Sequence, residues 1–195
     1  KGSEEKLEHM VLKFCDEIVM KLTGERGISL SRIAFVSDET RNKEIYVSDV
    51  MGNNIRQVTK HRHIAVSPRF SPDGNKLAYT SYHKNNANLY ITDLSQTKIT
   101  RAISRRKGLS MAPAWSPDGK KIAFSGESGM KPELWIMEDF LPLGKLAQKK
   151  EQSATKEPKG LTIKQVWTGE KADYTGSVSN DGKYLSFVDW ETGDL

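Results

Sequence analysis

Two of the four histidines, His61 and His63, lie two residues apart in the segment KHRHIAVSP at 60–68. Imidazole is the side chain best suited to proton transfer or metal binding near neutral pH, so this pair is the first candidate for chemistry. Two imidazoles do not complete a metal site, and the segment adds no Cys, Asp or Glu ligand. The other histidines, His9 and His83, belong to other segments. We therefore expect neither a metal nor a cofactor.

Candidate nucleophiles are equally sparse. Cys15 is the only cysteine, which excludes an intrachain disulfide, and its apolar neighbours predict a small buried side chain. The string GESG at 126–129 lacks the G-x-S-x-G form of a nucleophile elbow and the strand-to-helix turn that this motif needs. No glycine-rich phosphate loop precedes a helix. The sequence therefore predicts a protein that is not an enzyme.

The remaining candidate for a functional site is clustered positive charge. The formal net charge is +5, and two segments, 60–68 and RRKGLSMAP at 105–113, carry several basic residues each. A basic surface attracts acidic partners and speeds their encounter, whereas a merely solvated surface is the alternative. The basic residues are Lys60, Arg62, Arg105, Arg106 and Lys107.

An internal repeat determines where these segments lie. IAFVS, LAYTS, IAFSG and LSFVD begin at Ile33, Leu77, Ile122 and Leu185, with spacings of 44, 45 and 63 residues. A second string, typified by NLYITD, shares the first two spacings, and a third, typified by ITRAIS, shares the first. Four short β-rich strings in about 45 residues are typical of one four-stranded blade of a β-propeller. Asp-Gly pairs at 73–74, 118–119 and 181–182 predict two-residue hairpin loops between the first two strands of a blade.

Propeller geometry brings the basic segments together. Connections from the outer strand of one blade to the inner strand of the next all emerge on one face, around the mouth of the channel. The segments 60–68 and 105–113 are such connections, and 168–176 is the third. The sequence therefore predicts a basic mouth that includes His61 and His63 as well as the five basic side chains.

The chain before the repeat has a different period. Leu7, Met10, Phe14, Ile18 and Leu22 are spaced three and four residues apart, which predicts an amphipathic helix of about five turns. Its apolar stripe must pack on the propeller or belong to another domain. We expect residues 1–27 to be a remnant of an N-terminal α/β domain and 28–195 to be an incomplete propeller of about three and a half blades.

The blade boundaries follow from the repeat. They fall at about 28–66, 67–111, 112–173 and 174–195, the last being truncated. The third spacing is 18 residues longer than the period, and the excess lies at 140–160, a lysine-rich stretch that we expect to be an insertion between the third and fourth strands. Trp115 aligns with Phe70 and Trp135 with Tyr90, so the tryptophans are expected in the core rather than in a carbohydrate or nucleic-acid site. No apolar run approaches the length of a membrane span.

The strings CDEIVMKLTGERGISLSRIAFVS, SPRFSPDGNKLAYTS and APAWSPDGKKIAFSG resemble the TolB family of periplasmic propeller proteins of the Tol-Pal envelope system. The likeness covers residues 5–138. Residues 139–195 are more similar to propeller repeats of other bacterial multi-repeat proteins. The resemblance implies a non-enzymatic, periplasmic interaction scaffold with a six-bladed propeller. The N-terminal segment that engages TolA in that family has no counterpart here, and self-association of two chains could complete the ring.

The same resemblance implies that the mouth binds Pal, the peptidoglycan-associated lipoprotein. Ala112 matches an alanine of the family's Pal-binding loop, whereas Leu109 replaces a histidine there. The implied partner-binding residues are His61, Arg62, His63, Val66, Ser67, Arg105, Arg106, Leu109, Ser110, Met111 and Ala112. SPDG repeats also occur in prolyl-oligopeptidase-type enzymes, so a propeller of a peptidase or extracytoplasmic sensor, with its active domain outside this chain, is the alternative.

Overall fold

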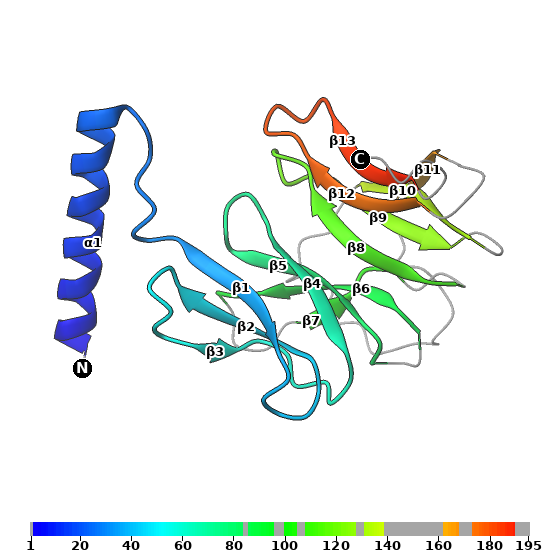
Figure 1. Ribbon diagram of the computed structural model, residues 1–195, viewed down its shortest axis with the longest axis horizontal. Coiled ribbons are helices and arrows are strands. Elements are labelled where there is room, and N and C mark those ends of the chain that lie inside the picture. The colour runs from blue at the N-terminus through cyan, green and yellow to red at the C-terminus, as the bar shows by residue number, and fades with distance from the viewer. Residues whose placement is uncertain are drawn as a thin grey trace.

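A single helix precedes a series of small antiparallel sheets (Figure 1). The computed structural model describes residues 2–83, 86–95, 100–104, 108–127, 131–138, 162–167 and 173–189. Helix α1 spans Gly2–Thr23 and ends at Gly24, whose φ of 76° suits the left-handed position after a helix.

Within the described residues, the strands form four sheets in chain order. The first is β1-β2-β3, the second β4-β5-β6-β7, the third β8-β9-β10-β11, and the last pairs β12 with β13. Within each sheet, each strand pairs antiparallel with the next strand in the chain, and the inner strands β4, β8 and β12 contact one another in succession. This meander is the blade of a β-propeller. The strands are β1 Arg32–Ser37, β2 Glu44–Asp49, β3 Arg56–Gln57, β4 Ala65–Phe70, β5 Lys76–Ser81, β6 Asn88–Asp93, β7 Thr100–Ala102, β8 Ser110–Trp115, β9 Ile122–Glu127, β10 Pro132–Glu138, β11 Thr162–Trp167, β12 Asp173–Val178 and β13 Leu185–Asp189.

The predicted extra length of the third blade falls between β10 and β11. These two strands pair antiparallel from Leu134–Trp167 to Glu138–Thr162, so they are neighbours in one sheet although 23 residues separate them in the chain. The predicted insertion at 140–160 itself lies outside the described residues.

Each SPDG string is a turn between the first two strands of a sheet, but not the predicted two-residue loop. The N–H of Ser71 donates to the carbonyl of Lys76 at 2.9 Å, so the loop comprises the four residues 72–75. Within it, the N–H of Gly74 donates to the carbonyl of Ser71 at 2.8 Å, and only the glycine has a positive φ. The hydroxyl of Ser71 donates to the Asp73 carboxylate, which also accepts the N–H of Asn75. These bonds lower the pKa of Asp73 from its ordinary value, the Ser71 hydroxyl contributing most. The turns at 116–119 and 179–182 repeat the same bonds.

The core lies between sheets. One cluster joins Ala78, Leu89 and Ile91 of the second sheet to Ile122, Phe124 and Met137 of the third. The other joins Ile45 and Val47 of β2 to Ala65, Leu77, Tyr79 and Tyr90 of the second sheet. Trp115 and Trp135 pack partly buried against the first cluster, consistent with the predicted structural role. Alternation of apolar residues in the strands thus makes faces that neighbouring sheets bury together.

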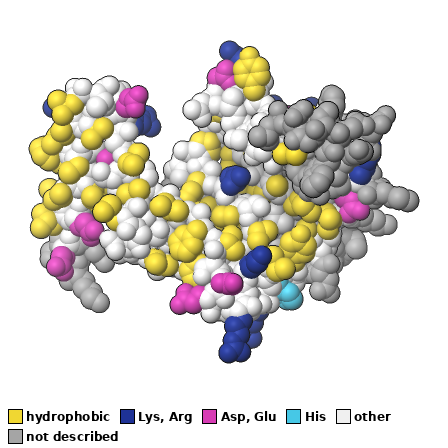
Figure 2. Space-filling view, viewed as in Figure 1, with side chains coloured by type: hydrophobic (Ala, Val, Ile, Leu, Met, Phe, Trp, Pro, Cys, Tyr) yellow, Lys and Arg dark blue, Asp and Glu magenta, His cyan; other side chains and the backbone are white. Residues whose placement is uncertain are grey.

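The helix does not bury its apolar stripe in the described structure. Leu7, Phe14 and Leu22 are 62%, 63% and 81% exposed, and Figure 2 shows hydrophobic side chains along the surface of α1. Cys15 is also exposed, so the prediction that it is buried is wrong, because no described sheet covers that face. The helix is instead held to its own linker: the carboxylate of Asp16 accepts the N–H groups of Ser29 at 2.9 Å and Leu30 at 3.3 Å. No helix in the described part of the chain has the length and apolar character that crossing a bilayer requires.

Candidate functional site at the loop end of the sheets

Two kinds of connection meet at the end of the sheets opposite the SPDG turns. One kind joins paired strands within a sheet, β1 to β2 at 38–43 and β5 to β6 at 82–87, and the other joins one sheet to the next, as at 58–64 and 103–109. Backbone hydrogen bonds tie them together: Ala65 N–H donates to Lys43 O at 2.7 Å, and Tyr82 N–H donates to Ile64 O at 2.9 Å. Equivalent bonds, Ser110 to Ala87 and Glu127 to Leu109, follow one repeat later. We call this surface the loop end.

Three predicted residues near the loop end have a positive φ: Arg62, which is described below with its pocket, and Ser67 and Ala112. Ser67 and Ala112 have φ values of 54° and 52°, the left-handed region, and each is followed by a proline. Both lie at bulges, where the pairing of β4 with β5 and of β8 with β9 shifts register. The N–H of Ala112 donates to the Thr80 hydroxyl of the preceding sheet at 3.0 Å. Left-handed non-glycine residues cost of order 1 kcal/mol and persist where surrounding contacts hold them, commonly at functional sites.

The other predicted residues of 109–112 are less open to a partner. The backbone N–H of Leu109 donates to the Glu127 carboxylate at 3.0 Å, and the Leu109 side chain is half-buried. Ser110 is fully buried, and its hydroxyl accepts from Ser104 at 2.7 Å, so this side chain faces the protein interior. Met111 and Val66 are half-buried. The predicted residues Arg105 and Arg106, with Lys107, lie outside the described residues.

The histidines of 60–68 are joined by a third that the sequence did not associate with them. His83, in the connection after β5, lies with its ring centroid 5.0 Å from that of His61 and 5.6 Å from that of His63. His61 also lies against the rings of Tyr79 and Tyr90, and its Nδ1 is 2.9 Å from the Ser81 hydroxyl. In the described residues, no three His, Cys, Asp or Glu side chains are arranged to hold a metal ion. The order of the strands could have predicted that His83 lies near His61 and His63, because the connections that carry them emerge at the same end of the sheets.

Burial lowers the pKa of His61 from its ordinary value, and the neighbouring His83 lowers it further; Glu44 opposes this shift and His63 adds to it. The unfolded chain therefore binds more protons than the folded chain just below pH 6.5, the ordinary value. Stability contributed by neutral His61 is complete above that pH and is lost as the pH falls toward the folded pKa.

We expect the free energy of unfolding to decrease as the pH falls from about 7 to about 5.5, where ordinary histidines titrate. Replacing His61 by asparagine, which retains a polar group near Ser81, should flatten this part of the curve. Denaturant unfolding at stepped pH measures it, with His9→Asn on the helix as control. Equal pH dependence in the wild type and the His61 variant would contradict the expectation.

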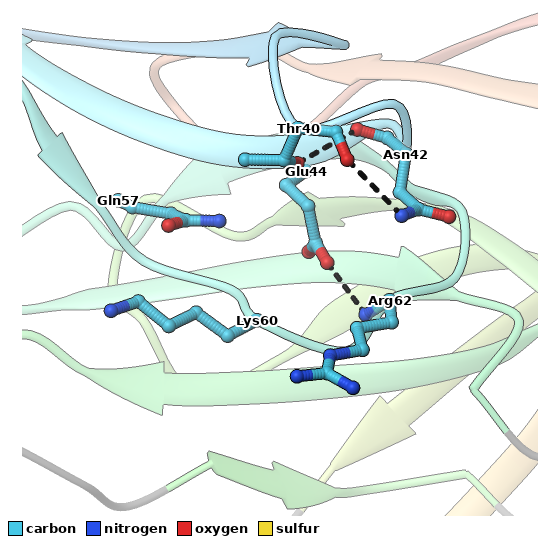
Figure 3. A pocket seen from close by; sticks show the side chains of 6 residues that line it. All are labelled: Thr40, Asn42, Glu44, Gln57, Lys60 and Arg62. Atoms are coloured by element: carbon cyan, nitrogen blue, oxygen red, sulfur yellow. Dashed lines mark hydrogen bonds between the residues drawn. The ribbon is translucent and has the colours of Figure 1, made fainter.

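A pocket of about 380 Å³ lies beside this histidine cluster, at the loop end of β2 and β3 (Figure 3). Its lining residues all have polar or charged side chains, among them the cations Lys60 and Arg62 and the amides Asn42 and Gln57. The full set is Thr40, Asn42, Glu44, Gln57, Lys60 and Arg62. Sequence reasoning missed it because Asn42 and Gln57 carry no motif.

Glu44 forms the buried wall of the pocket and is only 2% exposed. One carboxylate oxygen accepts the Thr59 hydroxyl, and the other accepts the N–H of Arg62 at 2.7 Å. The Thr59 hydroxyl in turn accepts the N–H of Ile45 at 2.8 Å. Arg62 has a φ of 57°, so a buried carboxylate holds its backbone in the left-handed region. The carboxylate has neutral donors on both oxygens and leaves the side-chain cations free of it.

A family model of the TolB β-propeller domain matches residues 19–159, more than half of the chain. The chain belongs to the TolB β-propeller family. The predicted family and fold class, a mainly β, incomplete propeller preceded by one helix, are confirmed. The matched residues include α1 from Val19 onward and every strand from β1 to β10.

Among curated relatives, this TolB-like chain is 53% identical over 104 residues to the Tol-Pal system protein TolB of Desulfotalea psychrophila, which covers 53% of the chain and 24% of the relative. It is 43% identical over 94 residues to the protein TolB homolog of Chlorobaculum tepidum, covering 48% of the chain and 22% of the relative. The matches thus span about a quarter of the length of these relatives.

Solved structures agree on the fold. TolB from Acinetobacter baumannii superposes with a TM-score of 0.57 at 24% identity, covering 92% of this chain and 52% of that one. A prolyl endopeptidase structure superposes with a TM-score of 0.53 at 18% identity, covering 84% and 25%. At these identities both comparisons bear on the fold alone, so the second one adds no evidence for a peptidase function.

Proposed function

We propose that this TolB-like chain is a non-enzymatic, periplasmic interaction scaffold of the Tol-Pal system. It binds Pal, the peptidoglycan-associated lipoprotein, through the loop end of its sheets. Membership of the TolB propeller family carries the proposal, together with relatives that bear the name Tol-Pal system protein TolB. The scaffold role needs only a preformed surface, and no reaction step is assigned to any side chain.

The left-handed pair Ser67 and Ala112 supports the loop end as the binding surface. These residues recur one repeat apart, at bulges of adjacent inner strands, and β4 contacts β8. Their side chains are half-buried and belong to neither core cluster. A rigid, strained backbone presents a surface that loses little conformational entropy on binding.

The test is binding of purified Pal, measured by calorimetry with the wild-type chain and with Ala112→Lys. Lysine at this position places a long charged side chain on the proposed surface, and we expect affinity to fall about tenfold or more. Asn53→Lys is the matched control, because Asn53 is exposed in the connection after β2 at the opposite end of the sheets.

Absence of Pal binding by the folded wild-type chain would overturn the proposal. An equal loss of affinity in Ala112→Lys and Asn53→Lys would contradict the assignment of the surface. Circular dichroism of each variant confirms that the sheets are intact, so that a loss of affinity reports on the surface and not on folding.

A further inference from the structure

The pocket beside β2 and β3 has free positive charge at its edge. Lys60 and Arg62 are exposed, and neither forms an ion pair with any residue in the described ranges. The one acidic group of the lining, Glu44, is buried and uses both oxygens on the Thr59 hydroxyl and the Arg62 backbone. Two cations therefore face the pocket against one carboxylate that is already bonded to neutral donors.

The repeat supplies an internal comparison, because the same positions recur in the second sheet. Asn86 is the counterpart of Asn42, and its amide donates to the carbonyl of Gly108 at 2.6 Å, joining the two connections. Asn42 instead donates to Thr40 at 3.4 Å within its own connection. Among the described residues, the first sheet has no such amide bond between its two connections. The pocket lies at this position in the first sheet.

The third sheet gives a similar contrast for Gln57, another lining residue of the pocket. Gln165 is the counterpart of Gln57 and donates to the carboxylate of Glu133 at 2.6 Å, while Glu133 is the counterpart of Glu44. In the first sheet, Glu44 bonds Thr59 and Arg62, and the Gln57 amide has no hydrogen bond to a described residue. Figure 3 shows the Gln57 amide, Lys60 and Arg62 around the same opening.

We infer that this pocket binds the carboxylate of an aspartate or glutamate side chain of a protein partner, with Lys60 and Arg62 as its cationic ligands. Guanidinium and ammonium groups bind carboxylates through short, charge-assisted hydrogen bonds, and an amide such as Gln57 adds a neutral donor. Every lining residue carries a polar or charged side chain, which favours a polar ligand. Arg62 is preorganised, because Glu44 fixes its left-handed backbone before the ligand arrives.

The inference rests on the proposed function, since it names the chemistry by which a protein partner would be held at the loop end. It goes beyond the basic mouth that the sequence predicts, because it assigns the contact to one pocket of the first sheet. It also assigns Glu44, which is inaccessible to a partner, as the positioning residue of Arg62.

The test uses a fluorescein-labelled hexaglutamate peptide and its hexaglutamine counterpart, with binding followed by fluorescence anisotropy at low and at physiological salt. We expect hexaglutamate to bind and hexaglutamine not to bind, with affinity falling as salt rises. Replacing both cations, K60Q with R62Q, should weaken hexaglutamate binding about tenfold or more, since two charge-assisted contacts are lost.

The matched control is K43Q with R56Q. Both residues are exposed on the same sheet, each is adjacent in sequence to a pocket residue, and neither lines the pocket. The change in net charge is the same, so we expect less than a twofold loss. Equal losses in the two double variants, or no loss in K60Q with R62Q, would overturn the inference.

Side-chain amide signals in ¹H–¹⁵N spectra give a second readout that does not depend on variants. Addition of hexaglutamate should shift Asn42 and Gln57 and leave their counterparts Asn86 and Gln165 in place. Shifts confined to the counterparts would also overturn the inference. If Pal still binds while the pocket fails these tests, the proposed function stands; if hexaglutamate binds the pocket but Pal does not bind, the pocket stands and the proposed function fails.

Discussion

Replacing Phe124 by alanine is expected to reduce the free energy of unfolding by about 3–5 kcal/mol, the range for deleting a buried aromatic ring. Phe124 has no exposed surface and lies in the cluster that joins the second and third sheets. Its neighbours Leu89 and Ile91 belong to β6, whereas Met137 belongs to β10, so the ring contributes to the contact between sheets as well as to its own strand. Chemical denaturation followed by circular dichroism measures the loss.

Two further variants identify the cause of that loss. Phe124→Leu retains most of the apolar volume and should cost less than the alanine variant, because a smaller cavity remains. Tyr184→Ala removes a ring that is 71% exposed and should change stability by less than about 0.5 kcal/mol, as surface substitutions do. A loss below 1 kcal/mol for Phe124→Ala would contradict the assignment of this cluster as the core between sheets.

The strands and their order could be predicted from the sequence because the repeat carries redundant information. The apolar runs that begin at Ile33, Leu77 and Ile122 are β1, β5 and β9, and each pairs with the strand that the next repeated string predicts. A period near 45 residues leaves room for four short strands only. Local pattern and global fold agree here, which is typical of foldable sequences.

The details of the turns could not be predicted from the Asp-Gly pairs alone. That pair suits a two-residue loop, but the serine two residues before each aspartate lengthens the turn. The Ser71 hydroxyl bonds the Asp73 carboxylate, and its oxygen also accepts the N–H of Lys76 at 2.9 Å, which stabilises a four-residue turn. Side chain–backbone competition of this kind depends on the serine as well as on the Asp-Gly pair, since the turn at 179–182 makes the same bonds without the proline.

The candidate site was predicted only in part, because its chemistry depends on contacts between distant segments. A residue before proline favours an extended backbone, so the left-handed φ of Ala112 was not expected. In this conformation the N–H of Ala112 donates to the hydroxyl of Thr80, which belongs to a different sheet. His83 and the pocket were missed for the same reason: their neighbours are 20 or more residues away in the chain or carry no motif.

The second large effect is expected at Glu44. Replacing it by alanine leaves the Thr59 hydroxyl and the Arg62 N–H without their acceptor, in a place where the side chain is 2% exposed. The buried Thr59 hydroxyl costs about 1–3 kcal/mol when it loses its partner, and the partly buried Arg62 N–H costs less because water can reach it, so we expect a total loss of about 2–3 kcal/mol.

Asn88→Ala is the matched control, since Asn88 occupies the same place in β6. Its amide makes one hydrogen bond, to the carbonyl of Asn86 at 3.1 Å, and its Oδ1 has no partner among the described residues. Asn88→Ala should reduce the free energy of unfolding by about 1 kcal/mol, the net contribution of one neutral hydrogen bond. Denaturant unfolding of both variants gives the difference directly.

Glu44→Gln separates the structural role from the charge. A glutamine can still accept the Arg62 N–H through its oxygen, but its amide can only donate toward Thr59, whose hydroxyl proton then loses its acceptor. We expect an intermediate loss of about 1–2 kcal/mol for one unsatisfied buried group. Because the same substitution removes the only negative charge of the pocket lining while leaving Arg62 bonded, hexaglutamate should bind this variant at least as tightly as the wild type. Weaker binding with unchanged stability would mean that the Glu44 charge aids the ligand, which contradicts a pocket built for carboxylates.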